Sequence, residues 1–135
     1  MYGTTEIEKS LIEPFELWEN KESNLYSIHV EHPEYTALCP RSGYPDNGII
    51  IVDYIPKSFV IELKSFKLYI NAFRNIGISH EAATGKIFEK IKKEADPLEL
   101  RVIGDFMRRG GVKTVIEFNL NPDEYKFNDY LATIL

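Results

Sequence analysis

Between residues 98 and 118 the sequence alternates apolar and polar side chains on both sides of a glycine pair, Gly110 and Gly111. A period of two is typical of a strand with one buried face. Two glycines between such strands favour a tight turn, because glycine adopts positive φ angles at little steric cost. The sequence therefore predicts an antiparallel hairpin here. Its apolar series is Leu98, Leu100, Val102, Phe106, Val112, Ile116 and Phe118.

Two amphipathic helices are expected before the hairpin. Residues 64–75 carry apolar side chains at i, i+4 and i+7, the spacing that lines one helix face. We expect Ser65 to cap this helix and Gly77 to end it. A second helix is expected to begin after Ser79 and to end at Asp96, which precedes a proline. The two apolar stripes are Phe66, Ile70 and Phe73, and then Ala83, Ile87 and Ile91.

Shorter extended segments precede the helices. Residues 25–30 alternate, residues 35–38 favour a strand, residues 48–55 are strongly apolar, and residues 59–63 form a further short extended piece. The order is strands, two helices and a hairpin. That order predicts an α+β fold with an antiparallel sheet and helices on one face.

The length of 135 residues suggests one domain. Residues 1–22 are polar and acidic, and we expect a loosely ordered N-terminal arm there. Residues 23–135 then form a single domain that ends in a tail with aromatic anchors over residues 123–135. The expected anchors of the tail are Tyr125, Phe127 and Tyr130.

The charge is unevenly distributed along the chain. The net charge of −5 argues weakly against a nucleic-acid partner. Residues 41–113 nevertheless carry thirteen Lys and Arg against nine Asp and Glu, whereas both ends of the chain are acidic. A small anionic ligand would suit this locally basic section.

The chain holds one cysteine, Cys39, which excludes an intrachain disulfide and makes a reducing cytoplasm the expected location. We find no signal peptide and no apolar stretch near the ~18 residues of a membrane span, so we expect no membrane partner. His29 and His32 would lie on opposite faces of a strand, and we therefore expect structural roles for them and no metal site.

Cys39 lies in a loop rich in turn-forming residues. Pro40 and Pro45 each fix a φ angle, and Gly43 permits conformations closed to other residues. Asp46 follows seven positions after the cysteine. Such a loop can hold a thiol and a carboxyl group in a set relation. The alternative is that Cys39 is a small buried side chain, because free cysteines are usually buried and inert.

Four segments resemble the NADPH-dependent 7-cyano-7-deazaguanine reductases, the QueF family of nitrile reductases. They are Leu38–Asp46, Glu62–Tyr69, Phe73–Asn75 and His80–Glu81. The Glu-Leu-Lys-Ser-Phe-Lys stretch is similar to the signature of that family, and the resemblance covers well over half of the chain.

This resemblance implies a tunnelling fold, in which a four-stranded antiparallel sheet has two helices between its strand pairs. Proteins of this fold assemble as homo-oligomeric rings, here expected as two stacked rings, with active sites at subunit boundaries. The implied reaction reduces the nitrile of 7-cyano-7-deazaguanine to the amine of 7-aminomethyl-7-deazaguanine with two NADPH, in queuosine biosynthesis. The substrate is then a small molecule, and no direct nucleic-acid contact is expected.

The resemblance also implies residue roles. Cys39 would attack the nitrile carbon to give a covalent thioimide, and Asp46 would give a proton to the nitrogen. An ordinary thiol needs a nearby base or positive field for this step, which Arg41 could supply. The carboxylate of Glu81 would accept hydrogen bonds from the ring N–H and exocyclic amine of the substrate. The implied substrate-binding residues are Ile61, Glu62, Leu63, His80 and Glu81. The implied cofactor-binding residues are Lys64, Ser65, Lys67, Arg74 and Arg109.

Three alternatives stay open at this point. A QueF-like amidinotransferase, which acts on nitrile-bearing tRNA, shares the cysteine, the aspartate and the His–Glu pair but lacks the full cofactor motif. A non-catalytic purine- or pterin-binding module could use the same fold, because a fold alone does not determine function. The lysines of residues 64–75 and the turn that contains Arg109 could also be solvated surface.

Overall fold

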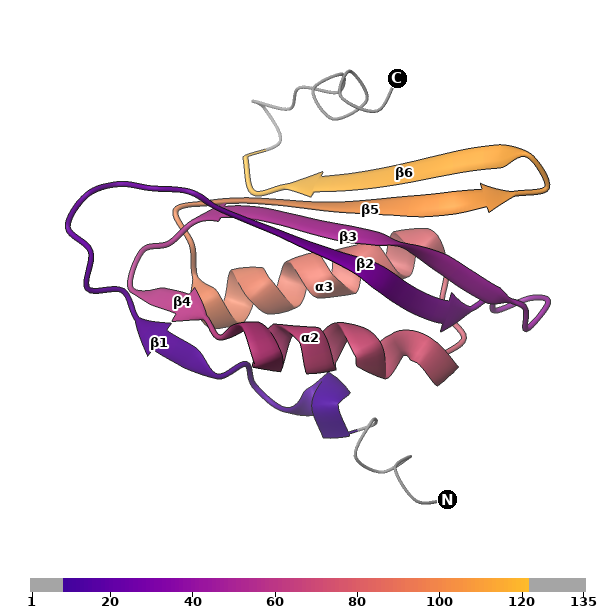
Figure 1. Ribbon diagram of the computed structural model, residues 1–135, viewed down its shortest axis with the longest axis horizontal. Coiled ribbons are helices and arrows are strands. Elements are labelled where there is room, and N and C mark those ends of the chain that lie inside the picture. Colours follow the sequence, from indigo (N-terminus) through magenta and orange to yellow (C-terminus); the bar gives the residue numbers. More distant parts are fainter. Residues whose placement is uncertain (1–8, 122–135) are drawn as a thin grey trace.

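A four-stranded antiparallel sheet forms the centre of the molecule (Figure 1). The structure is a computed structural model, and it describes residues 9–121. The strands lie in the order β2-β3-β5-β6. Their bounds are β2 Ile28–Leu38, β3 Pro45–Ile55, β5 Glu99–Arg109 and β6 Val112–Asn119. The predicted α+β class and four-stranded antiparallel sheet are therefore confirmed.

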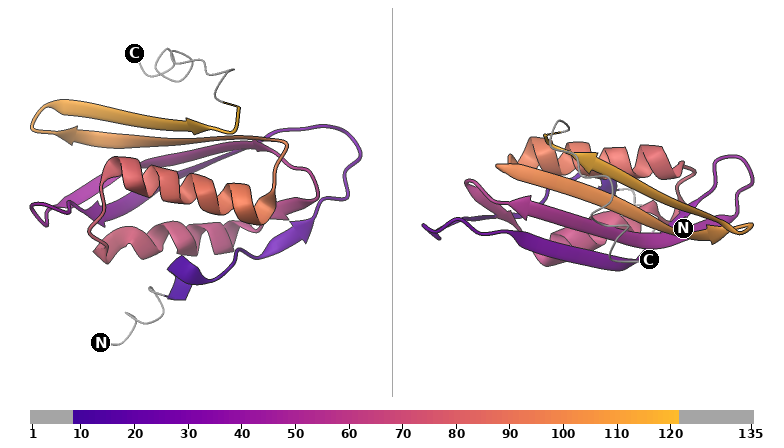
Figure 2. Two further views of the ribbon diagram at one scale, coloured as in Figure 1. Left: turned by 180° about the vertical axis from the view of Figure 1, so that it is seen from behind. Right: turned by 90° about the horizontal axis from the view of Figure 1, so that it is seen from above.

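Two helices and a 3-10 segment cover one face of this sheet, as Figure 2 shows from behind and from above. They are α2 (Leu63–Asn71), η1 (Ala72–Asn75) and α3 (His80–Ala95), and they lie in the chain between the strand pairs β2-β3 and β5-β6. The core forms between the helices and the sheet. Its fully buried side chains include Tyr35, Ile50, Val52, Ile70, Phe73, Ile87, Ile91, Val102 and Phe106. No helix among the described residues is long and apolar enough to cross a bilayer.

The predicted helix stripes are buried as expected, but two predicted helix ends are wrong. Gly77 does not end the first helix, because α2 ends at Asn71, η1 ends at Asn75 and Ile76 is already extended. Ser79 caps α3 by accepting a hydrogen bond from the Ala82 amide, and the helix ends at Asp96, both as predicted. The cap of α2 is Glu62 rather than Ser65. The glutamate side chain accepts hydrogen bonds from the Lys64 and Ser65 amides of the first turn. The helix therefore begins two residues before the expected cap.

The N-terminal segment differs from the expected loose arm. The strand β1 (Leu17–Glu19) pairs with β4 (Phe59–Ile61) in a two-stranded sheet that the sequence did not predict. Phe15 is only 5% exposed and belongs to the core. The described part of residues 1–22 is thus packed onto the domain, because Phe15 packs against Phe66 and Tyr69 of α2. The predicted anchors Tyr125, Phe127 and Tyr130 lie outside the described residues.

The expected segments 25–30 and 35–38 merge into the single strand β2, with a register irregularity between His32 and Tyr35. The predicted hairpin turn is confirmed, since Gly110 and Gly111 both have positive φ angles of 58° and 83°. Such angles place a penalty on any residue with a Cβ atom.

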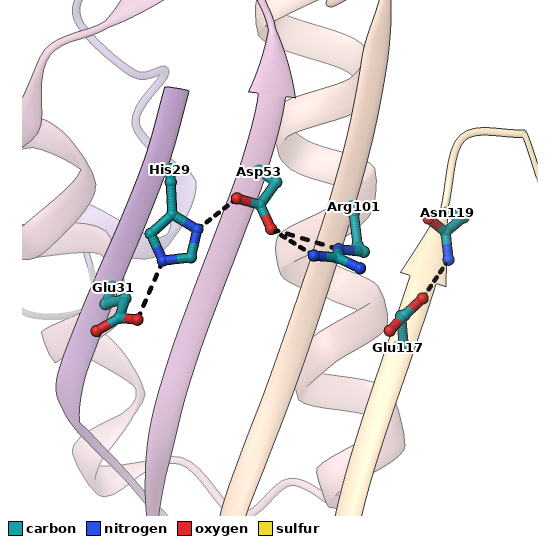
Figure 3. Close-up of polar contacts among 6 residues, drawn as sticks. All are labelled: His29, Glu31, Asp53, Arg101, Glu117 and Asn119. Carbon is teal, nitrogen blue, oxygen red and sulfur yellow. Dashed lines mark hydrogen bonds and ion pairs between the residues drawn. The ribbon is translucent and has the colours of Figure 1, made fainter. Parts of the chain in front are cut away.

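The sheet face that the helices leave uncovered carries a polar row that crosses all four strands (Figure 3). His29 of β2 contacts Asp53 of β3, and Arg101 of β5 donates to the same carboxylate at 3.0 Å. Glu31 accepts from the other side of the His29 ring at 3.0 Å. His32, in contrast, is buried and contacts the Phe66 ring. The two histidines therefore lie on different faces, as the strand period predicts.

Candidate active site

Cys39 is the first residue after β2, and its loop is closed by two backbone hydrogen bonds. The Cys39 amide donates to the Tyr44 carbonyl at 2.8 Å, and the Gly43 amide donates to the Cys39 carbonyl at 2.9 Å. Gly43 has a φ of 75°, which a residue with a side chain rarely adopts. The loop backbone is thereby fixed, and the thiol is partly exposed rather than buried.

The surroundings of Cys39 favour its ionised form. The Ser42 hydroxyl, the Ser42 and Arg41 amides and the Arg109 side chain lower the pKa of the Cys39 thiol to about 6, the Ser42 hydroxyl having the largest effect. The thiolate is the nucleophilic form of cysteine, so at neutral pH the side chain is already activated. An inert core cysteine would instead be surrounded by apolar groups.

Asp46 and Arg109 lie beside this loop. Asp46, near the start of β3, has a side chain that is 6% exposed, and it accepts a hydrogen bond of 2.7 Å from Arg109 Nη1. Arg109 Nη2 donates to the Ser42 hydroxyl, also at 2.7 Å. Contact with Cys39, followed by the charge of Asp46, raises the pKa of Arg109. One guanidinium therefore bridges the carboxylate and the thiol loop.

His80 and Glu81 lie at the same end of the sheet as Cys39. The chain after η1 runs alongside Leu38, whose amide donates to Ile76 and whose carbonyl accepts from Ile78. Helix α3 begins at His80, two residues later, so its first turn lies next to the end of β2. The His80 ring stacks on Phe106 with 3.9 Å between the centroids. Glu81 is exposed.

The other predicted binding residues lie at the opposite end of the sheet. Ile61 donates its amide to the Tyr54 hydroxyl, and Tyr54 pairs with Ile28 at the start of β2. Cys39 follows the far end of this eleven-residue strand, which is roughly 35 Å long. The segment of residues 61–67 and the thiol do not meet within one chain.

Several of these residues already have partners. Both carboxylate oxygens of Glu62 cap α2, one on the Lys64 amide at 2.9 Å and one on the Ser65 amide at 2.7 Å. The Ser65 hydroxyl accepts from the Glu16 amide at 2.9 Å. Leu63 and Lys67, in contrast, line a cavity of about 450 Å³ between β2 and α2.

The predicted cations divide between the two ends. Lys64 and Lys67 are exposed on the first turns of α2, whereas Arg74 is exposed on η1, close to the Cys39 end. Arg109 belongs to the thiol site. The cations therefore do not form one cluster within a single chain.

Comparison with known proteins identifies the family of this chain. The sequence model described as QueF-like protein matches residues 45–124, which is more than half of the chain. This chain belongs to the QueF-like protein family. The match begins at the first residue of β3 and includes Asp46, both helices and the hairpin.

Among relatives of this QueF-like chain is the NADPH-dependent 7-cyano-7-deazaguanine reductase of Campylobacter lari, 47% identical over 116 residues, which are 86% of this chain and 91% of the relative. The protein of the same description from Wolinella succinogenes is 42% identical over 118 residues, covering 87% of this chain and 95% of the relative. The aligned regions thus cover nearly the whole length of these proteins.

The crystal structure of the archaeosine synthase QueF-Like in the apo form has the same fold, with a TM-score of 0.63 and 24% identity over 73% of this chain and 95% of the other. This neighbour agrees with the predicted tunnelling type of fold.

Sequence reasoning missed one residue of the QueF-like site. Ser42 provides the hydroxyl that most strongly favours the thiolate. A serine three positions after a cysteine within a turn was the available signal, because short hydroxyl side chains bond to groups of their own turn. The bridging position of Arg109 had no local signal, since its partners come from another strand pair.

Proposed function

We propose that this chain is an NADPH-dependent 7-cyano-7-deazaguanine reductase, which converts the nitrile to 7-aminomethyl-7-deazaguanine in queuosine biosynthesis. The observation that carries the proposal is the activated Cys39 thiol beside the buried carboxylate of Asp46. The close relatives of that description support the choice of substrate and cofactor. The free base, rather than tRNA, is the substrate, and a reducing cytoplasm keeps Cys39 a thiol.

Cys39 acts as the nucleophile in this proposal. Its thiolate adds to the nitrile carbon, a C–S bond forms, and one π bond of the nitrile becomes the lone pair that is protonated on nitrogen. The Asp46 carboxylate takes a proton from solvent and passes it to this nitrogen, while Arg109 keeps the carboxylate next to the loop. With one hydride equivalent from a bound NADPH the adduct would be reduced, and breakage of its C–S bond would return the thiolate and leave the imine. A second hydride equivalent would reduce the imine to the amine.

Recognition of the base uses the first turn of α3. The exposed carboxylate of Glu81 accepts hydrogen bonds from two adjacent N–H groups of the deazaguanine. His80 contacts the base from a ring orientation fixed by its stack on Phe106. Ile61, Glu62 and Leu63 contact the base from a second subunit, since within one subunit they lie at the end of the sheet opposite Cys39.

The basic residues of α2 and η1 fit an anionic dinucleotide. Lys64 and Lys67 are exposed cations on the first turns of α2, and each can act as a point charge on a phosphate although Glu62 occupies the amides of the helix N-terminus. Arg74 adds a further exposed cation, and Ser65 belongs to the same turn as Lys64. NADPH supplies two hydride equivalents when bound. Arg109 already bonds to Asp46 and Ser42 at the thiol site. It can contact a phosphate of NADPH only if the cofactor extends to the end of the sheet that carries Cys39.

A ring assembly would complete the site. The two groups of binding residues lie toward opposite ends of the sheet, and this separation favours a site made by two subunits. The open edges of β2 and β6 offer backbone groups for pairing between copies. We expect light scattering to report a large oligomer, consistent with two stacked rings. A fully active monomer would contradict this part of the proposal.

The decisive experiment measures adduct formation and cofactor oxidation separately. Incubation with the nitrile but without NADPH should add one substrate mass to the protein, and Cys39→Ala should form no adduct. Adding NADPH to the parent should release the amine with consumption of two NADPH. An adduct without any NADPH oxidation would instead support the amidinotransferase, and no adduct at all would support a non-catalytic module.

A further inference from the structure

The segment of residues 13–16, here called the strap, crosses the first turn of α2. The Glu16 amide donates to the Ser65 hydroxyl at 2.9 Å, and the Glu16 carbonyl accepts from the Glu62 amide at 3.0 Å. Directly after the strap, β1 pairs with β4. The strap thus bonds to the backbone and the side chain of the segment that carries the proposed substrate and cofactor contacts.

A partly buried ion pair on α3 holds the strap from the other side. Glu94 accepts from the Phe15 amide at 2.7 Å, and Lys90 donates to the Glu13 carbonyl at 2.8 Å. Lys90 and Glu94 also contact each other at 2.7 Å, with only 10% and 23% of their side chains exposed. Each charge has polar partners on both the strap and the helix.

The ring of Phe15 adds apolar contacts that hold the strap against α2. Phe15 is 5% exposed and packs edge-to-face on Tyr69 at 5.3 Å between centroids. Lys90 Nζ lies 4.8 Å from the Phe15 ring and 5.1 Å from the Tyr69 ring, within cation–π distance of both. Removing the ammonium would leave the Glu94 carboxylate half-buried without its counter-ion, which is the costly half of a broken ion pair.

We infer that Lys90 and Glu94 are positioning residues for the segment of residues 61–65, and that they act through the strap. The inference rests on the proposed function, because that function gives the segment its ligands. The strap uses the Glu62 amide and the Ser65 hydroxyl, so it sets the geometry of the turn from which the neighbouring side chains project. A loosened strap leaves this turn competent for only part of the time, and apparent affinity falls by that fraction.

This role differs from simple stabilisation in its kinetic signature. A segment that is ordered again on binding loses affinity but not the rate of the bound complex. The Michaelis constant for NADPH should therefore rise while kcat stays nearly unchanged. A pair that only supports the fold would lower the melting temperature and leave both constants as they are.

The test uses the full chain with Lys90→Met, which keeps most of the apolar stem, and Glu94→Gln, which keeps the shape of the acceptor. If the strap is attached for a fifth of the time, the Michaelis constant for NADPH rises about fivefold and kcat stays within about twofold. Lys90→Arg should restore the parent constant. The matched control is Lys93→Met, an exposed lysine of the same helix, and it should change nothing.

Hydrogen exchange gives a readout that needs no turnover. The amides of Phe15, Glu16 and Glu62 donate to bonds of the strap, so the two variants should exchange them about tenfold faster than the parent. Unchanged exchange would show that the ion pair does not hold the strap. Faster exchange with an unchanged Michaelis constant would show that the strap does not position the binding segment. Either result overturns the inference, whereas a parent that oxidises no NADPH overturns the proposed function alone.

Discussion

Arg109 Nη1 lies 2.7 Å from a carboxylate oxygen of Asp46, although the two residues are 63 positions apart in the chain. The pairing of β3 with β5 brings the end of β5 over the loop that follows β2. The second amino group of Arg109 reaches the hydroxyl of Ser42 at 2.7 Å. A single cation thereby contacts the carboxylate and supports the thiolate of Cys39, and a change at Arg109 should affect both.

The first prediction concerns the thiol titration. The pKa of Cys39 is lowered to about 6, so the thiol is protonated below that pH and reactive above it. Ser42→Ala should move the midpoint of alkylation upward the most, because its hydroxyl has the largest effect, and Arg109→Met should move it upward less. Rates of iodoacetamide alkylation across pH measure this. A parent midpoint near the ordinary value of about 8.5 would contradict the activated thiol.

The second prediction separates proton transfer from binding at Asp46. Asp46→Asn keeps the shape and the acceptor oxygen for Arg109 but carries no transferable acid proton, so turnover should fall about 100-fold or more. The dissociation constant of the nitrile, measured by calorimetry in the Cys39→Ala background, should change little. A large loss of affinity with normal turnover of the bound complex would assign Asp46 to recognition instead.

Much of the fold could be predicted because its signals are local. The period of two around Gly110, the stripe that includes Phe66 and the cap at Ser79 each depend on residues within a few positions of one another. The β1–β4 pair could not be predicted in this way. Its strands are three residues each, and what orders Leu17 is its pairing with the distant Ile61 and its packing against the core rather than propensity.

The active site was predictable only in part for the same reason. The loop between Cys39 and Asp46 is continuous in sequence, and its Pro and Gly residues predict a fixed backbone conformation. The bridge made by Arg109 depends on strand register, which fixes which side chains meet across the sheet. Glu62 could not be assigned from sequence for a different reason. Its carboxylate can cap α2 or contact the substrate, and the sequence does not show which role it takes.

The third prediction tests these two roles of Glu62. Glu62→Ala removes the cap of α2 and should lower the free energy of unfolding by about 1 kcal/mol. Glu62→Asp retains a good capping residue but shortens the side chain by one methylene. It should keep the stability and, if the carboxylate also contacts the substrate, raise the Michaelis constant for the nitrile. Chemical denaturation measures the stability of each variant, and steady-state kinetics measure its Michaelis constant for the nitrile. A Glu62→Ala variant as stable as the parent would show that the cap does not stabilise the fold.

The fourth prediction concerns His29 on the uncovered face of the sheet (Figure 3). Hydrogen bonds to Glu31 and then to Asp53 raise the pKa of His29, so folding favours its charged form. Its stabilisation is complete below the unfolded pKa of about 6.5 and disappears as the pH rises through the higher folded value. His29→Gln should therefore cost about 0.5 kcal/mol at about pH 5.5, because the exposed ring is screened by solvent. At about pH 9 it should cost less, and an equal loss at both values would contradict the linkage.

The fifth prediction concerns the cofactor. Lys64 and Lys67 are exposed on the first turns of α2. Each lysine acts as a point charge, so a dinucleotide with an additional phosphate gains most from the pair. The parent should therefore prefer NADPH to NADH. The double variant Lys64→Ala with Lys67→Ala should lose most of this preference and raise the Michaelis constant for NADPH about tenfold or more.

The same double variant should still form the covalent adduct when the nitrile is saturating, because within one subunit Cys39 lies at the other end of the sheet from these lysines. Lys86→Ala provides a control, since it removes one lysine from α3 while leaving the basic residues of α2 in place. Steady-state kinetics with both dinucleotides and intact-protein mass after incubation with the nitrile measure the two effects. Normal NADPH oxidation by the double variant would show that α2 does not bind the cofactor, and a simultaneous loss of the adduct would place these lysines in the substrate site of a neighbouring subunit.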